Sequence, residues 1–382
     1  MALQHTPDAA VPLDYQRQDA RDVFRVLGAG ESCALVGVGS VGKSSFLRFI
    51  TRTDVKQHYL GEQEGARLIT VLLNPHHLIH LQDQALAESG SVWPGYELML
   101  SRLRRTLSSM VAQGALPLAA AGQRALLDMV SQCYGMLFDD RALLRQTGIR
   151  QLEDAVLEVV RASEHLRLAF MFDEFEAFVH LPPQFFQSLR GLRDDFKQRV
   201  MFLTASRTPL DALAQAAYPS APEQQALEGF VELFYGFTHH MRLLDDDSAV
   251  FSVRRLENRN HLERIAPVLE RELLRTTGGH AGLLRRAFLP ATRIAVPENV
   301  DRPSFIDYLL ADSGVQQECR AMLASLTPAE QRLLLEIATQ RQTVADSNPV
   351  WQALLDKHLV GRRADGTAAL TIPVFAMFLL RA

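Results

Sequence analysis

The sequence has little cysteine and no long hydrophobic run. Its 382 residues include three cysteines, which are far apart and form no C-x-x-C pair: Cys33, Cys133 and Cys319. This spacing excludes a disulfide framework or a zinc site built on cysteine pairs, and it fits a reducing compartment. No apolar run approaches the roughly 18 residues of a membrane span, and the first residues lack the segments of a signal peptide. We therefore expect a cytoplasmic protein that has no membrane partner.

The chain also lacks an excess of positive charge. Its formal net charge is -4, so its composition does not predict non-specific affinity for nucleic acid, although a local basic patch stays open. The hydrophobic content of 47% is enough for two or three ordinary cores in a chain of this length. We expect a multidomain globular protein.

A glycine-rich run carries the first functional signal. Residues Gly37 to Ser44 match the pattern G-x-x-x-x-G-K-[ST] at every fixed position and directly follow the apolar run at 32–36. A strand that ends in such a loop and enters a helix turns several backbone N–H groups and the positive helix end toward one phosphate. Lys43 would then reach the β- and γ-phosphates, and the Ser44 hydroxyl would ligate Mg²⁺. The predicted nucleotide contacts in this P-loop are Gly37, Val38, Gly39, Ser40, Val41, Gly42, Lys43, Ser44 and Ser45.

Three further apolar runs, at 67–73, 166–172 and 199–204, predict buried parallel strands. The second of them ends in Asp173 and Glu174, which is the form of a Walker B strand. Adjacent carboxylates at a strand end diverge, so we expect Asp173 to hold Mg²⁺ through water and Glu174 to accept a proton from the attacking water. No N-K-x-D sequence, which reads guanine, occurs in the chain. ATP is therefore preferred over GTP.

Arginines near the third of these runs are candidate sensors of the nucleotide. Arg207 follows the strand directly and would lie between the two nucleotide-binding strands if the sheet has the order of additional-strand ATPases. It would then contact the γ-phosphate, although an ordinary pair with a carboxylate is an equal alternative. Arg190, Arg193 and Arg199 flank the preceding helix and are candidates for an arginine finger acting on a second subunit. Such a role would require an oligomer.

The order of elements predicts three domains. Strand signals stop near residue 245, so 1–245 is assigned to an α/β P-loop core with a parallel sheet, and 246–312 to an all-helical lid. Residues 313–382 predict three helices and then two short strands joined by Ala364-Asp365-Gly366, a hairpin turn. This order is typical of a winged-helix domain.

The predicted winged helix has few side chains suited to DNA. In its candidate recognition helix, at 349–358, only Gln352 and Lys357 are of the types that read base edges, and Arg362 and Arg363 in the wing could contact phosphates. DNA is therefore a possible partner that is not favoured. We prefer an interpretation in which this domain packs on the ATPase core or on a partner.

Together these motifs resemble the AAA+ and STAND P-loop ATPases, an additional-strand class, and especially the bacterial and archaeal members related to origin-recognition proteins. The resemblance implies that Tyr15-Gln16-Arg17 is a start motif that contacts adenine, with Arg17 as a binding residue. It also implies that the run from Thr204 to Arg207 is sensor 1. It also implies that 277–284 is the family's G-G-H-P-G-L-L stretch, in which His280 joins the lid to the nucleotide. Ala281 replaces the proline of that stretch. Arg285 stands where sensor 2 is expected, although an exposed helical arginine is an alternative.

Two main functions follow from this resemblance. The preferred one is a slow, regulated ATPase with Mg²⁺ and ATP or ADP, acting as a molecular switch that signals to a partner in trans or assembles with itself. The alternative is a DNA-associated ATPase of the replication-initiator or transposition-helper type. A nucleotide-holding scaffold without turnover is a third possibility. His76, His77 and His80 lack a nearby third ligand, and we predict no zinc there.

Overall fold

The computed structural model describes residues 11–79, 92–139, 144–218, 220–294, 302–340 and 343–381. Residues 1–13, which include Pro7 and Pro12, predict a tail from the sequence. All but the last three of them, and His80, lie outside the described residues. The chain divides into two compact units. We call residues 18–36 and 44–239 the sheet unit, and residues 1–17, 37–43 and 240–382 the helical unit.

The sheet unit contains a five-stranded sheet in the order β2-β3-β4-β1-β5. Its strands are β1 (Cys33–Val36), β2 (Leu68–Leu73), β3 (Arg167–Phe172), β4 (Val200–Ser206) and β5 (Thr238–His240), the last of which crosses the boundary at its final residue. The pairs β1–β4, β3–β4 and β2–β3 are parallel. The expected α/β fold with a parallel sheet is confirmed, and β4 lies between β1 and β3 as the additional-strand order requires. Strand β5 has no apolar run and is not among the predicted strands.

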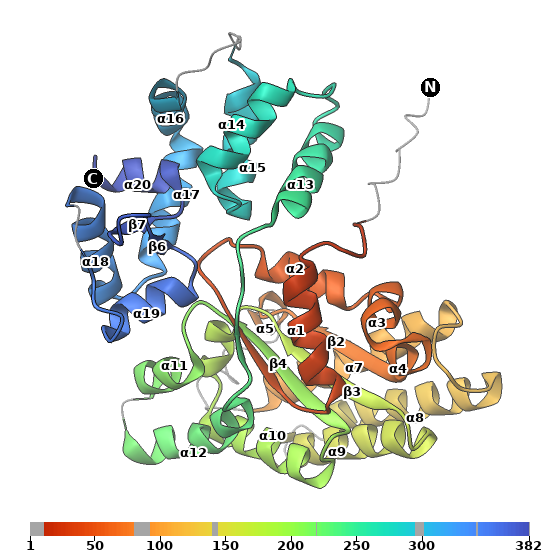
Figure 1. The fold of residues 1–382 in the computed structure, drawn as a ribbon. Helices are drawn as coiled ribbons and strands as arrows, with labels where there is room; N and C mark the ends of the chain where they lie inside the picture. The colour runs from red at the N-terminus through yellow and green to blue at the C-terminus, as the bar shows by residue number, and fades with distance from the viewer. Residues whose placement is uncertain are drawn as a thin grey trace. The chain divides into compact units, whose positions relative to one another are not determined.

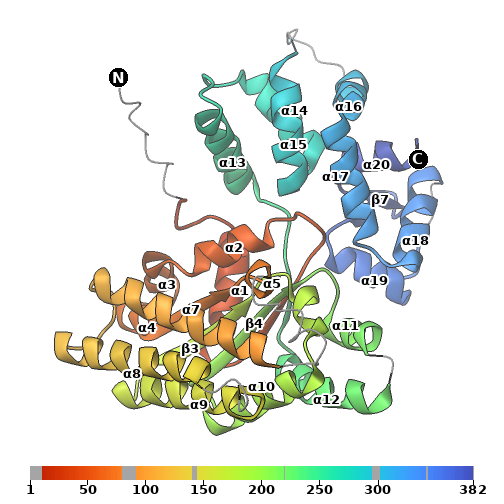
Figure 2. The same ribbon diagram turned by 180° about the vertical axis from the view of Figure 1, so that it is seen from behind.

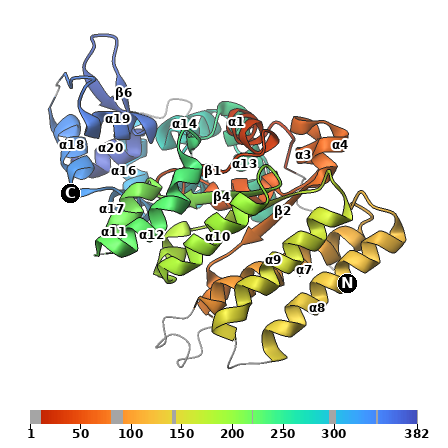
Figure 3. The same ribbon diagram turned by 90° about the horizontal axis from the view of Figure 1, so that it is seen from below.

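Helices cover both faces of this sheet (Figures 1, 2 and 3). Helix α1 (Arg17–Gly28) lies on one face, and α7 (Trp93–Ala112), α8 (Ala120–Asp139) and α9 (Leu144–Ala162) lie on the other. The remaining helices of this part of the chain are α2 (Lys43–Ile50), α3 (Thr53–Leu60), α4 (Glu62–Arg67), α5 (His76–Ile79), the 3-10 helix η1 (Phe175–His180), α10 (Pro183–Asp195), α11 (Leu210–Ala217), α12 (Ala221–Val231) and the 3-10 helix η2 (Glu232–Phe234).

The position of α1 follows from its sequence. Ala20, Val23, Phe24 and Leu27 recur at helical spacing and are at most 1% exposed, so they form the apolar face that packs inward. The helix then stops before Gly30, whose φ of +79° is a left-handed conformation that glycine adopts without strain. The helical spacing of the apolar residues and the glycines at 28 and 30 predict this helix and its end from the sequence.

Phenylalanines dominate the core on the face of α7 to α10. The ring of Phe172, the last residue of β3, meets the rings of Phe175 and Phe178 edge to face, with centroids 5.8 and 5.0 Å apart. Phe175 in turn stacks on Phe230, and all four side chains are at most 1% exposed. Edge-to-face pairs contribute about 0.5–1.5 kcal/mol each beyond the burial of their area. The backbone on both sides of Asp173 and Glu174 is thereby fixed.

The helical unit contains helices followed by a hairpin. Its elements are α13 (Asp246–Arg259), α14 (Pro267–Thr277), α15 (Ala281–Thr292), α16 (Arg302–Ala311), α17 (Ser313–Ala324), α18 (Pro328–Thr339), α19 (Pro349–Asp356), β6 (Val360–Arg362), β7 (Ala368–Leu370) and α20 (Pro373–Leu379). Strands β6 and β7 pair antiparallel, which confirms the predicted hairpin. Residues 246–382 all fall within one unit. The boundary at residue 312 between a lid domain and a winged-helix domain therefore stays a prediction.

Among the described residues, no helix is long and apolar enough to cross a membrane.

Candidate nucleotide-binding site

The P-loop between β1 and α2 has the backbone that its glycines allow. Gly42 has a φ of +118°, and Ser40 has a φ of +56°, which is unusual for a residue with a side chain. Lys43 donates through Nζ to the carbonyl oxygens of Gly37 and Val38, at 2.6 and 2.9 Å. The ammonium group is therefore held over its own loop, where it can meet a phosphate as a point charge. Val38, Val41 and Gly39 are buried, whereas Ser40 and Ser45 are exposed.

The first turn of α2 is bonded to the end of β3. Ser44 donates through Oγ to Oδ1 of Asp173 at 2.9 Å, and Asp173 is 3% exposed. Serine hydroxyl and carboxylate oxygens are ligands that Mg²⁺ prefers. The two residues predicted to hold the metal therefore lie together, and their oxygens fit it. Among the described residues, no cluster of three or more His, Cys, Asp and Glu side chains offers another metal site.

Glu174 differs from Asp173 in exposure and in backbone conformation. Its side chain is exposed, and its φ of 48° and ψ of 57° are left-handed, at the entry to η1. Such a conformation costs on the order of 1–3 kcal/mol in a residue other than glycine and is frequent in functional sites. Asp173 is thus buried and Glu174 exposed, and the separate roles of the two carboxylates stay a prediction. The exposed one is free to meet a water molecule.

The end of β4 offers buried hydroxyl groups in place of a cation. Thr204 pairs in register with Ala34 and Phe172, is 0% exposed, and its Oγ1 has no hydrogen-bond partner among the described residues. The side chain of Arg207 is exposed, and its backbone N–H donates to the Glu176 carboxylate. Thr204 belongs to the run that resembles sensor 1, and its burial and unpaired hydroxyl make it a stronger candidate than Arg207.

The start motif divides into a buried and an exposed residue. Arg17 is exposed and lies 3.7 Å from Asp14. Gln16 is 2% exposed, and neither atom of its side-chain amide has a hydrogen-bond partner among the described residues. A buried unpaired amide is costly, on the order of 1–3 kcal/mol. Gln16 is thus a stronger candidate than Arg17 for contact with a ligand.

His280 contacts the P-loop backbone. It caps the N-terminus of α15, where its Nδ1 accepts from the Leu283 N–H at 3.1 Å. Because Nδ1 is the acceptor, Nε2 carries the proton and donates to the Gly39 carbonyl oxygen at 3.0 Å. Both ring nitrogens are used and the ring is 0% exposed. His280 therefore joins α15 to the P-loop, while Arg285 on the same helix is exposed.

The glycines before His280 are required by close packing. Gly278 and Gly279 have φ values of +56° and +75°, and a Cβ on Gly279 would lie 2.4 Å from the Leu244 carbonyl oxygen. Only glycine fits this turn from α14 into His280.

The three candidate arginine fingers are all engaged within the sheet unit. Arg193 is 6% exposed and bonds the Gly30 carbonyl oxygen. Arg199 donates to three backbone carbonyl oxygens, those of Leu166, Val160 and Ser163. Arg190 contacts Asp194, Gly229 and Glu232. These contacts argue against the finger hypothesis for each of them, because contacting a second subunit would break the hydrogen bonds that each side chain makes here.

Comparison with solved structures identifies the fold. A Walker-type ATPase of Pyrococcus abyssi is similar to this chain with a TM-score of 0.51 at 15% identity, covering 96% of this chain and 95% of that chain. The chain has the same fold as that protein. The ORC1 protein of Aeropyrum pernix, solved in complex with DNA, gives a TM-score of 0.38 at 12% identity over 99% and 94% of the two chains, too low to support an argument. No protein-family model and no curated protein matches the sequence.

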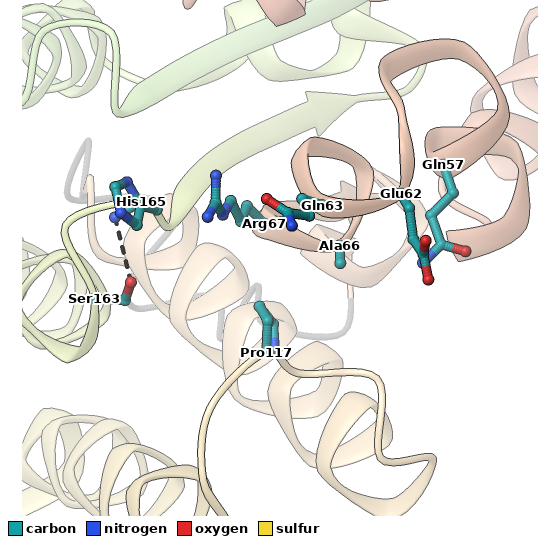
Figure 4. A pocket seen from close by; sticks show the side chains of 8 residues that line it. All are labelled: Gln57, Glu62, Gln63, Ala66, Arg67, Pro117, Ser163 and His165. Atoms are coloured by element: carbon teal, nitrogen blue, oxygen red, sulfur yellow. Dashed lines mark hydrogen bonds between the residues drawn. The ribbon is translucent and has the colours of Figure 1, made fainter.

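A separate pocket of about 480 Å³ lies in the sheet unit (Figure 4). Its lining residues are Gln57, Glu62, Gln63, Ala66, Arg67, Pro117, Ser163 and His165. Arg67 and His165 come just before β2 and β3, so the pocket lies at the amino ends of these strands. Nucleotides bind at the carboxyl ends of parallel strands. This pocket is therefore not the nucleotide site.

The buried His280 predicts a dependence of stability on pH. Burial lowers its pKa to about 4, Lys43 and Arg285 act in the same direction, and the Gly39 carbonyl and Glu318 oppose them. An unfolded histidine has a pKa of about 6.5, so the unfolded chain binds more protons than the folded chain between these values. Stability should fall as the pH falls from 6.5 to 4.

Thermal unfolding of His280→Gln across this range should show a smaller loss of stability than wild type. His165→Gln, at an exposed position, is the matched control and should follow wild type. If the stability of all three proteins changed equally with pH, the lowered pKa of His280 would be contradicted.

Proposed function

We propose that the protein binds Mg-ATP at the P-loop and hydrolyses it slowly, as a molecular switch. The observation that carries this proposal is the arrangement of Lys43 over the P-loop carbonyls together with the Ser44–Asp173 hydrogen bond at 2.9 Å. These are the polar groups that a phosphate and its metal need, on elements of a P-loop ATPase fold.

Each residue has a separate role in the proposed reaction. The P-loop N–H groups and Lys43 bind the phosphates, while Ser44 and Asp173 hold Mg²⁺, which when bound neutralises phosphate charge. Glu174 accepts a proton from the water that attacks the γ-phosphorus, and its exposure keeps it accessible to that water. Thr204, with its unpaired hydroxyl, is a candidate donor to a phosphate oxygen.

Gln16 supplies a physical reason for a preference for adenine. Its amide offers one donor and one acceptor, and this pair complements the amino group and ring nitrogen of adenine. Guanine presents two acceptors on the equivalent edge, which would leave the amide oxygen unpaired. We propose that Gln16, with its neighbours in the start motif, recognises the base.

In the proposed switch, the conformational change that follows nucleotide binding takes place in the helical unit. Residues 313–382 are proposed to form a winged helix whose conformation changes with the bound nucleotide. A partner protein in trans or a second copy of the chain would bind one of these conformations. DNA is a less suitable binding partner for these residues. Lys357 is 4% exposed and paired with Glu330 at 2.6 Å, and Arg362 bonds the Val344 and Gly366 carbonyl oxygens and contacts the Asp346 carboxylate. Two of the three cations that the sequence suggested for DNA contact are thus engaged within the helical unit, while Arg363 is exposed.

Lys43→Ala should weaken ATP binding by roughly 30-fold or more, because a cation next to a bound phosphate is lost. Isothermal titration calorimetry with ATP and Mg²⁺ measures this. Lys197→Ala, which removes an exposed lysine, should bind as wild type does. Equal ATP affinity in Lys43→Ala and wild type would refute the nucleotide site.

Glu174→Gln should bind ATP with near wild-type affinity and lose about 10²-fold or more in turnover, because the amide cannot accept the proton. Phosphate release under single-turnover conditions measures the loss. Glu164→Gln, at a position 83% exposed, is the control. If wild type releases no phosphate and Glu174→Gln behaves identically, hydrolysis is excluded and a nucleotide-holding scaffold is left.

Gln16→Leu should reduce the preference for ATP over GTP by about tenfold, because the hydrogen bonds that distinguish the bases are lost. Competition of the two nucleotides for the wild-type and variant proteins gives the ratio. Gln18→Leu, at an exposed position two residues further on, should keep the wild-type ratio. An unchanged ratio in Gln16→Leu would assign base recognition elsewhere.

A further inference from the structure

One P-loop residue is bonded through both its N–H and its carbonyl group by residues from the later part of the helical unit. The Gly39 N–H donates to Oγ of Ser325 at 3.2 Å, and the Gly39 carbonyl oxygen accepts from His280 at 3.0 Å. Gly39 is buried, and a Cβ placed on it would lie 3.5 Å from the Ala321 carbonyl oxygen. The C-terminal end of α17 therefore packs directly on this glycine.

The Ser325 hydroxyl is oriented for this contact. It donates to the Met322 carbonyl oxygen at 2.6 Å, so a lone pair is left for the Gly39 N–H. Ser325 is 8% exposed and caps the end of α17. Two residues later Thr327 begins α18 with a capping box. Ser325 thus stands at the joint between two helices of the C-terminal segment.

A third contact holds the next residue of the loop. The Ser40 carbonyl oxygen accepts from the Gly282 N–H at 3.0 Å. A Cβ on Gly282 would lie 2.6 Å from the Ser40 Cβ and 2.4 Å from Oε1 of Glu318 on α17, so only glycine allows this approach. The left-handed Ser40, with its φ of +56°, is held in place by this bond.

From these contacts we infer that Ser325 is a positioning residue for the P-loop, and that it couples ATP binding to the C-terminal segment from α17 onward. This inference rests on the proposed ATP site. The Ser325–Gly39 bond and the His280–Gly39 bond hold the loop in the conformation that places Lys43 over the carbonyls of Gly37 and Val38. Coupling between two sites is reciprocal. ATP in the loop must therefore stabilise the α17–α18 joint to the same degree.

The test compares Ser325→Ala with Ser313→Ala, which removes an exposed serine at the start of the same helix. Ser325→Ala should raise the Kd for ATP about threefold to tenfold, the effect of losing one hydrogen bond. It should also reduce the protection from hydrogen exchange that ATP gives to residues 313–339. Ser313→Ala should match wild type in both measurements. Equal Kd and equal protection in Ser325→Ala and wild type would overturn the inference.

A measurement without nucleotide separates this inference from the proposed function. Hydrogen exchange of the peptide that contains Gly39 should be faster in Ser325→Ala than in Ser313→Ala in the absence of ATP. If wild type does not bind ATP, the proposed function fails, while this exchange experiment still decides whether Ser325 positions the loop. Should Ser325→Ala unfold, Ser325→Cys, which keeps the size but has a weak acceptor, replaces it and should give the same changes.

Discussion

The hydrogen bond between Ser44 and Asp173 is the contact on which the arrangement of the site depends. It joins the first turn of α2, the helix that follows β1, to the end of β3. Strands β1 and β3 are not adjacent in the sheet, because β4 lies between them. The bond is possible only because parallel strands bring their carboxyl ends to one edge. The register of Val36 with Ser206 and of Phe172 with Thr204 sets the level at which the three strands end. Sheet order therefore places the two predicted metal ligands and the buried hydroxyl of Thr204 at the same edge.

The end of β3 stays in place because of the phenylalanine core beneath it. Phe172 and Phe175 flank the two carboxylates and are buried among other aromatic rings. Their packing offsets the left-handed backbone of Glu174, which an exposed loop would relax. In the helical unit, the Gly278–Gly279 turn fixes the direction of His280 in the same way. Rigid packing on neighbouring residues thus supports each functional side chain.

Much of the fold was predictable from the sequence. The four apolar runs became β1 to β4, α1 ends at its glycines, and the Ala364–Gly366 turn joins a hairpin, because each has a local signal of periodicity or turn chemistry. β5 was missed because Thr238, His239 and His240 carry no apolar pattern. The Walker residues were found from spacing alone. Gln16 and Thr204 became informative only when their burial and unpaired polar atoms were known.

The sequence by itself determined a glycine-rich loop that matches the P-loop pattern and a carboxylate pair at a strand end, since both are local combinations of residue type and spacing. The tertiary structure decided which of these polar and charged groups form contacts within the protein. It buries Lys357 against Glu330, bonds Arg193 to a carbonyl oxygen and places Ser325 on Gly39, from a position 286 residues further along the chain. A contact over such a separation has no local signature, because it depends on how helices pack and not on the residues beside it.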